Sequence, residues 1–302
     1  MDPRWGLALR SWEWRPEVIL VLALAGTIFG RGWWRLRRQG RGRLAAGWRL
    51  AAYLGGLAVL ALALLSPVDT LGSYLFFVHM VQHLLLMMLA PPLLLVANPF
   101  PFALWGLPAS VQQEVVRLFR RQAPFRRFLR SATAPGVTWM LFIAVFLGWH
   151  DPGAYDAALR SDWIHDLEHL SFFGSAMLFW WHVTAAGPRL QRFPQGARIA
   201  YLLSVVPPNM LTGVAIAFAQ KPIYPYYVAI PRLWGMTPIA DQRLGGVIMW
   251  IPGSMMYLLA ALILITRLIQ AEDQKPLLPE SRWATDEAMI APGLEGRAHG
   301  QR

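Results

Sequence analysis

The sequence predicts an all-α, polytopic membrane protein, a bundle of seven transmembrane helices. Two features of its composition predict this class. Of the 302 residues, 56% are hydrophobic and only 15% are charged, so a single soluble core is a poor description of the chain. The hydrophobic residues also gather in runs of about 20, the length that an α-helix needs to cross a bilayer.

Seven such runs follow one another along the chain. Their approximate bounds are residues 16–29, 47–65, 74–97, 135–149, 163–184, 199–219 and 244–269. The first and the fourth are short for a membrane-spanning helix. Prolines at positions 91–92, 207–208 and 252 fall inside the third, sixth and seventh runs. We expect them to kink these helices, because proline has no backbone N–H to donate.

The 28 Lys and Arg residues indicate how the bundle is oriented. Counted over alternate loops, 21 lie on one side and 7 on the other. Cytoplasmic loops are enriched in Lys and Arg, so we predict an external N-terminus and a cytoplasmic C-terminus. Because the basic residues occupy short loops between apolar runs, the net charge of +11 does not indicate a nucleic-acid partner. The predicted organisation is a seven-span membrane domain, residues 1–270, and a disordered cytoplasmic tail, residues 271–302.

Five of the seven histidines fall at one predicted depth, near the outer face of the membrane. Two lie four residues apart in the third run, two in the fifth, and one directly after the fourth: His79, His83, His165, His169 and His150. Ionisable side chains inside a spanning helix are costly and usually mark a functional site. Residues four apart share a helix face. Two facing pairs could supply up to four imidazole ligands, so we predict a metal site inside the bundle.

Other side chains near these faces could orient the histidines or add ligands. The candidates are Gln82, Asp162, Asp166, Glu168, Asp241, Gln242, Met87 and Met249. Carboxylates and amides commonly fix the tautomer of a ligating imidazole. Thioethers together with imidazoles suit copper, whereas histidine and carboxylate without methionine suit zinc or Cu(II). The chain has no cysteine, which excludes disulfides and thiolate metal sites.

The histidine pattern leaves three other hypotheses open. An intramembrane zinc-dependent hydrolase would activate a zinc-bound water with Glu168 or Asp162 as the base, although the sequence has no His-Glu-x-x-His motif. A b-type haem protein would use facing histidines as axial ligands. A scaffold without a cofactor would only recruit other proteins. We expect no enzymatic activity, with the hydrolase as the alternative.

Three segments with distinctive residues follow one another between the third and seventh runs. They are His79-x-x-Gln82-His83 leading into Ala90-Pro91-Pro92, then His165-Asp166-Leu167-Glu168-His169, then Asp241-Gln242-x-Leu244-Gly245-Gly246 followed by Met249-Trp250. In these segments the chain resembles the polytopic CtaG-type cytochrome c oxidase assembly factors of bacteria, which are associated with caa-type oxidases. The resemblance implies a multi-pass protein of the bacterial plasma membrane whose partners are oxidase subunits, and it points to a role in supplying copper.

The histidine pattern and the resemblance together suggest one hypothesis for the site. We expect the two histidine pairs, with His150 as a fifth candidate, to bind a copper ion at the outer membrane face and pass it to an oxidase subunit. Zinc and haem b are the alternative cofactors. Only neutral imidazole binds a metal, so binding is expected to weaken below about pH 6.5, the ordinary pKa of histidine.

Overall fold

The computed structural model describes residues 11–120, 123–187 and 193–274. Within these ranges the protein is all-helical and has no strand. The chain divides into two compact units, residues 1–261 and residues 262–302. The described part of the second unit is mainly the end of the last helix, whose final residue is Asp273. The predicted disordered tail therefore lies almost wholly outside the described residues.

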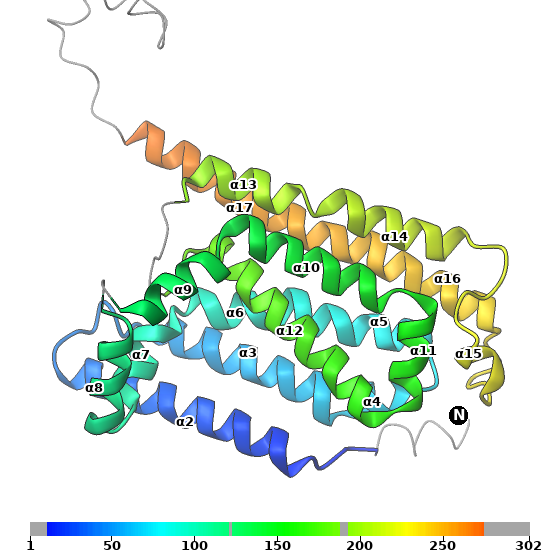
Figure 1. Cartoon of the computed structure of the whole chain (residues 1–302), viewed down its shortest axis with the longest axis horizontal. Helices are drawn as coiled ribbons and strands as arrows, with labels where there is room; N and C mark the ends of the chain where they lie inside the picture. Colours follow the sequence, from blue (N-terminus) through cyan, green and yellow to red (C-terminus); the bar gives the residue numbers. More distant parts are fainter. Residues whose placement is uncertain (1–10, 121–122, 188–192, 275–302) are drawn as a thin grey trace, which may run out of the picture. The chain divides into compact units, whose positions relative to one another are not determined.

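Helices follow one another with short connections (Figure 1). The first half of the chain contains α2 (Pro16–Arg38), α3 (Gly47–Leu65), α4 (Pro67–Gly72), α5 (Phe76–Leu84), the π-helical η1 (Leu85–Leu89), α6 (Ala90–Val96), α7 (Pro99–Gly106), α8 (Ala109–Leu118), α9 (Pro124–Ala132) and α10 (Pro135–Trp149). The second half contains α11 (Pro152–Arg160), α12 (Asp162–Thr184), α13 (Gln195–Leu203), α14 (Val206–Phe218), α15 (Tyr226–Ala229), α16 (Pro238–Ile248), the π-helical η2 (Met249–Gly253) and α17 (Ser254–Asp273).

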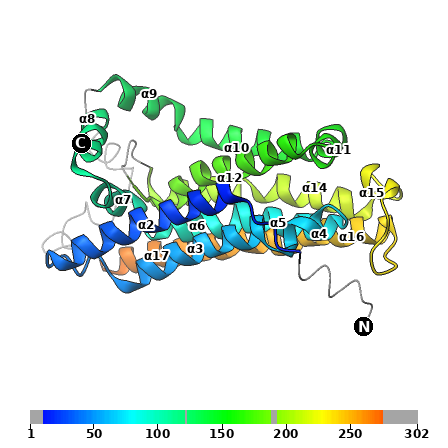
Figure 2. The same ribbon diagram turned by 90° about the horizontal axis from the view of Figure 1, so that it is seen from below.

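Five helical runs are long and apolar enough to cross a membrane. They are α2, α3, the run Phe76–Val96, the run Gln195–Phe218 and the run Pro238–Asp273. A sixth arises if α9 and α10, which meet at 55°, form one bent span; the bend is visible in Figure 2. The fifth predicted span coincides with α12, which carries three carboxylates in its first two turns and is not among the five. Length and composition thus support five or six of the seven predicted spans.

Proline marks the beginnings of many of these helices. Seven of the described helices start on a proline: α2, α4, α7, α9, α10, α11 and α16. Proline fits this position because its fixed φ suits a helix and its missing N–H would have had no partner in the first turn. The chain therefore signals many helix boundaries directly in its sequence.

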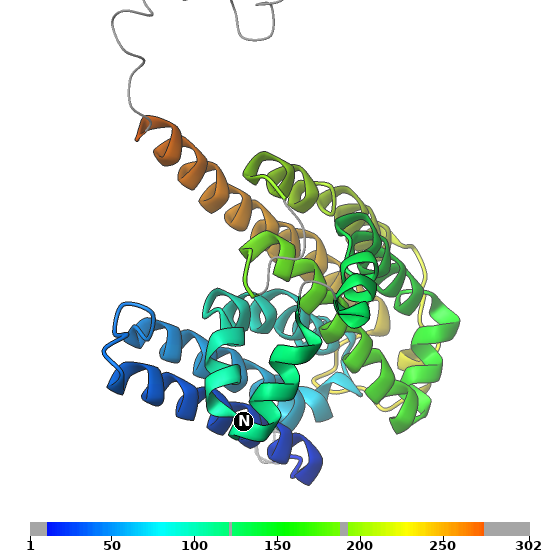
Figure 3. The ribbon, with the colours of Figure 1, turned by 60° about the vertical axis from the view of Figure 1, so that its left-hand side comes forward.

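The first helix is longer than the sequence pattern predicts. α2 continues nine residues beyond position 29 and ends at Arg38. Helix α2 packs against both α7 and α3. Figure 3 shows α3 beside α2. Glycines permit the close approach to α7: a Cβ on Gly32 would lie 1.8 Å from the backbone oxygen of Phe102, and one on Gly106 would lie 1.9 Å from that of Ile28. Small residues at such crossings let helix backbones touch.

Two π-helical segments interrupt the long runs near the predicted proline kinks. Pro91 cannot donate to the carbonyl of Met87 four residues before it. Trp180 of α12 supplies the missing donor, with its indole Nε1 2.8 Å from the Met87 oxygen. Around Pro252, the amide of Asn209 in α14 donates to the Met249 oxygen at 3.0 Å. A break between α13 and α14 precedes prolines 207–208, so the structure confirms an interruption at each of the three predicted sites.

Candidate metal centre

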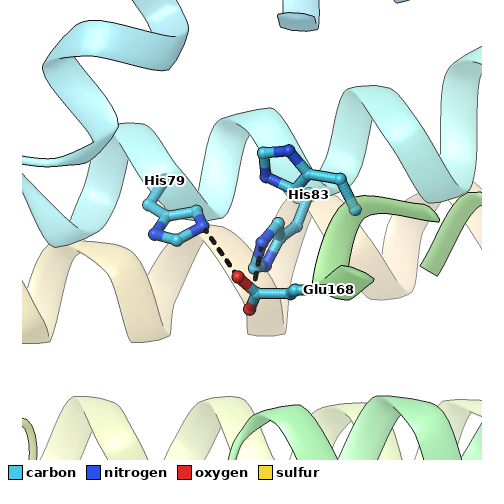
Figure 4. Close-up of side chains that lie close together, drawn as sticks. His79, His83 and Glu168 are labelled. Carbon is cyan, nitrogen blue, oxygen red and sulfur yellow. Dashed lines mark ion pairs between the residues drawn. The ribbon is translucent and has the colours of Figure 1, made fainter. Parts of the chain in front are cut away.

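Helices α5 and α12 bring four ionisable side chains into one buried group. His79 and His83 come from α5, and Glu168 and His169 come from α12. One ligand atom from each of the four lies within 4.8 Å of all the others. The nearest carboxylate oxygens of Glu168 lie 3.7 Å from His79 Nε2 and 3.6 Å from His83 Nε2, the two contacts drawn in Figure 4. We call this group the inner site.

The four side chains of this group are buried. His79 and Glu168 are fully buried, and His83 and His169 are each only 5% exposed. Phe172, one turn beyond Glu168 on α12, packs its ring against His83 with ring centroids 4.6 Å apart. A carboxylate and three imidazoles in such a place need partners, because buried polar groups without them are costly.

Most of the polar atoms in the group have no hydrogen-bond partner among the described residues. The unpartnered atoms are His79 Nε2, both ring nitrogens of His83, both ring nitrogens of His169 and both carboxylate oxygens of Glu168. Each unsatisfied buried donor or acceptor costs about 1–3 kcal/mol. Imidazole nitrogens and carboxylate oxygens are also the ligands that divalent transition metals take in proteins. The residues present therefore fit a bound metal ion.

A chain of hydrogen bonds orients His79 toward the inner site. Its Nδ1 lies 2.8 Å from the hydroxyl of Tyr155 in α11 and 3.3 Å from that of Tyr227 in α15. The Tyr227 hydroxyl donates to the backbone oxygen of Gly72 at 2.7 Å and lies 3.2 Å from the Tyr155 hydroxyl. The Tyr227 hydroxyl donates its hydrogen to the backbone oxygen of Gly72. One consistent arrangement therefore has the Tyr155 hydroxyl donate to the Tyr227 hydroxyl, and His79 Nδ1 donate to the Tyr155 hydroxyl. That tautomer leaves the lone pair of His79 on Nε2, facing Glu168.

A second group adjoins the first and shares one residue with it. Ligand atoms of Asp69, His165 and His169 also lie within 4.8 Å of one another. Asp69 belongs to the short helix α4 and is 7% exposed. Gln82 of α5 donates a hydrogen bond to its Oδ1, and burial raises the pKa of the Asp69 carboxyl to about 7 although this hydrogen bond lowers it. We call this group the outer site.

A charged pair lies beside the outer site at the start of the bundle. The guanidinium of Arg15 donates a hydrogen bond to Asp166 at 2.7 Å. Burial lowers the pKa of Arg15, but interactions that include this hydrogen bond outweigh that effect and raise it. Both side chains line a pocket of about 390 Å³ between α2, α3 and α12, as does His169. The rest of the lining is mostly aliphatic, so the imidazole of His169 is one of the few polar groups that reach this pocket.

The remaining predicted residues have different surroundings. His150 lies beside the inner site, with its ring centroid 6.4 Å from that of His83, and its Nδ1 is 2.6 Å from the backbone oxygen of Phe146. Burial lowers the pKa of His150 to about 4 against the effect of that hydrogen bond, so its imidazole is neutral at neutral pH. Asp162 is exposed at the first turn of α12.

Asp241 and Gln242 of α16 bind backbone groups. Asp241 accepts hydrogen bonds from the N–H groups of Phe76 and Phe77, while Gln242 accepts from the N–H of Ile223 and donates to the backbone oxygen of Ile216. Met87 and Met249 are buried in the helix bundle. Their role as ligands stays a prediction.

Sequence reasoning did not single out three residues that contribute to this region: Asp69, Tyr155 and Tyr227. Asp69 carries a usable signal, since it is a lone carboxylate directly after the second apolar run, at the predicted depth of the histidines. The two tyrosines carry none, because they sit on the short helices α11 and α15, whose placement depends on long-range packing.

Fold and site together define a class: an all-helical protein with several potential membrane spans and a buried cluster of histidines and carboxylates. Residues 27–271 match the model of the cytochrome c oxidase caa3 assembly factor family, Caa3_CtaG. The chain belongs to this family, which confirms the resemblance seen in the three sequence segments.

Curated relatives occur in mycobacteria. An uncharacterized protein of Mycobacterium bovis and one of Mycobacterium tuberculosis are each 28% identical over 269 residues, covering 88% of this chain and 40% of the relative. An uncharacterized protein of Mycobacterium leprae is 28% identical over 243 residues, covering 79% of this chain and 36% of the relative. The chain thus spans about two fifths of the length of these relatives. No solved structure matches it.

Proposed function

We propose that this protein binds copper at the outer face of the bacterial plasma membrane and delivers it to a subunit of cytochrome c oxidase during assembly of that enzyme. The observation that carries the proposal is the inner site, where three imidazoles and one carboxylate converge in a buried place with their ligand atoms unpartnered. Membership of the oxidase assembly factor family supplies the client.

The set of ligands favours Cu(II) as the form of copper that is bound. Three histidines with one carboxylate suit Cu(II) or zinc, whereas Cu(I) prefers thiolate and thioether ligands. Glu168 is fully buried, and its negative charge would offset part of the charge of a divalent ion inside the bundle. The metal is cargo in this proposal, so the residues need only bind it, hold it and release it.

The orientation of the chain belongs to the same proposal. We place seven spans in the membrane, with α12 and the bent pair of α9 and α10 added to the five apolar runs, and the N-terminus outside. The excess of Lys and Arg on the opposite side supports this orientation. The acidic first turns of α12 then lie at the outer membrane surface, where carboxylates are tolerated and where a secreted copper donor could reach them.

Metal content tests the proposal. The protein is purified in mild detergent, loaded with Cu²⁺, and measured by mass spectrometry and electron paramagnetic resonance (EPR) next to the double variant His83→Ala, His169→Ala. We expect near-stoichiometric copper in the native protein and its loss in the double variant. His182→Ala is the matched control, since His182 lies 2.9 Å from the backbone oxygen of Thr133, away from the inner site; it should keep its copper.

Three other outcomes would overturn a part of this proposal. Unchanged copper in the double variant would mean that the site lies elsewhere in the chain. Zinc in the purified protein, or a Soret band from haem, would replace copper by that cofactor. No bound cofactor after loading would leave an assembly scaffold.

A further inference from the structure

The outer site offers a second place for a metal ion, separate from the inner one. Its three ligands are Asp69 from α4 and His165 and His169 from α12. The two sites have only His169 in common. Metal–nitrogen and metal–oxygen bonds are about 2.0–2.2 Å long, so all the ligands of one ion must lie close together. Two separate groups therefore indicate two ion positions.

Independent observations show that the outer site is prepared for a ligand. His169 is 95% buried, yet neither of its ring nitrogens has a partner among the described residues, and the same is true of His165 Nε2. Asp69 is held in place by Gln82, which also donates to the backbone oxygen of Ala63 at 2.8 Å. Gln82 lies between His79 and His83 on α5, so the helix that carries two inner ligands also carries the side chain that holds Asp69.

The two sites differ in how accessible they are. His165 is partly exposed, whereas His79 and Glu168 of the inner site are fully buried. His165 also precedes His169 by one helical turn, toward the start of α12. An ion that arrives from outside would therefore meet the outer site first.

We propose that the outer site is where the metal ion first binds, and that His169 stays bound to the ion while it moves to the inner site. This inference rests on the proposed function. In the transfer, bonds from the ion to Asp69 and His165 break and bonds to His79, His83 and Glu168 form, while one histidine remains bound throughout. The oxidation state of the ion does not change. A divalent cation that accepts two imidazoles and one carboxylate, Cu²⁺ or Zn²⁺, is the expected occupant.

Two pairs of substitutions separate the sites. His79→Ala with His83→Ala removes two inner ligands and leaves the outer site whole. Asp69→Asn with His165→Ala removes two outer ligands and leaves the inner site whole. Both pairs are made with His182→Ala and His299→Ala, so that histidines elsewhere do not bind the added ion. Elution as a single peak in detergent and an unchanged circular dichroism spectrum show that each variant is folded.

Titration with Cu²⁺ alone, followed by EPR, gives the readout. The variant without the inner ligands should still bind one Cu²⁺, with an affinity lower by roughly tenfold or more, the scale on which changes around a metal site act. Adding Asp69→Asn and His165→Ala to it should abolish this binding. The variant without the outer ligands should bind Cu²⁺ at the inner site but load at least tenfold more slowly in stopped-flow mixing.

The results that would overturn the inference are distinct from those against the proposed function. If the variant without inner ligands binds no Cu²⁺, or if its binding survives loss of Asp69 and His165, the outer site is not a metal site. A normal loading rate without the outer ligands would remove its loading role. In each of these cases the inner site still holds copper in the native protein. Absence of copper from the native protein itself would instead reject the proposed function.

Discussion

Asp241 caps a helix to which it is not adjacent in the sequence. Its Oδ2 accepts a hydrogen bond from the backbone N–H of Phe76, the first residue of α5, at 3.0 Å. The residue at the N-cap position of α5 is Leu75, which has no side-chain acceptor. The first N–H groups of a helix have no partner within the helix, so a carboxylate from α16 supplies one. The helix that carries His79 and His83 is thereby fixed at its start by the second half of the chain.

Loss of this carboxylate should both destabilise the protein and disturb the proposed metal site. Both oxygens of Asp241 are used: Oδ1 accepts from the N–H of Phe77 at 3.0 Å, and Oδ2 also accepts from Arg232 at 2.9 Å. Asp241→Asn keeps the shape of the side chain but loses one acceptor and the charge. We expect the free energy of unfolding in detergent to fall by about 1–3 kcal/mol, the cost of an unsatisfied buried group.

Chemical denaturation monitored by circular dichroism measures this loss, and Cu²⁺ titration measures the effect on the site. Asp162→Asn is the control, because Asp162 is exposed on α12. Equal stability of Asp241→Asn and the native protein would show that the N-terminus of α5 finds other partners.

The tyrosine pair should control metal affinity without controlling the fold. Tyr155→Phe removes the hydroxyl that lies 2.8 Å from His79 Nδ1, so His79 can take the tautomer that places its proton on Nε2, the atom that we propose as the metal ligand. We expect Cu²⁺ affinity to fall by about 10–100-fold, as for other residues that orient metal ligands. The EPR spectrum should lose the coupling to one nitrogen.

Tyr226→Phe serves as the matched control for that experiment. Tyr226 adjoins Tyr227 on α15, but its ring lies over Arg160. The affinity of the Tyr226→Phe protein for Cu²⁺ should stay at the native value. If Tyr155→Phe also binds Cu²⁺ as the native protein does, the hydroxyl chain does not set the tautomer of His79.

Helical periodicity was enough to predict which histidines gather, but not everything that surrounds them. The pairs His79, His83 and His165, His169 each share a face because they lie four residues apart. Glu168 is predicted near them only as a side chain that could fix the tautomer of a ring. Asp69 has a signal in its position after the second apolar run, whereas Tyr155 has none, because α11 is a short connecting helix whose position depends on packing against α12. Local sequence carries no information on such long-range contacts.

The same limit applies to the ends of the helices. The sequence suggests that the first apolar run stops near position 29, since glycine and arginine follow it. Helix α2 nevertheless continues to Arg38. Arginine and tryptophan side chains at the end of a span can extend to the membrane surface while the backbone stays helical. At this end of α2, Trp33 and Arg37 pack against each other, with the guanidinium 5.2 Å from the ring centroid, and they donate to the backbone oxygens of Ala46 and Ala45.

A glycine contact between α14 and α16 should be as important for stability as the cap at α5. A Cβ on Gly246 would lie 2.5 Å from the backbone nitrogen of Ala217 and 2.8 Å from the oxygen of Gly213. Backbone atoms cannot move aside as the end of a flexible side chain can, so Gly246→Ala must push the two helices apart. We expect a loss of about 1–3 kcal/mol in the free energy of unfolding, the usual cost of overpacking. Copper loading should fall as well, because α16 also carries Asp241.

Gly136→Ala on α10 is the control, since a Cβ there would meet no atom within 4 Å. This substitution should leave stability unchanged or raise it by up to about 1 kcal/mol, the helix preference of alanine over glycine. Denaturation curves for the two variants side by side decide the matter: if Gly246→Ala is as stable as Gly136→Ala, α14 and α16 do not approach as closely as these distances require.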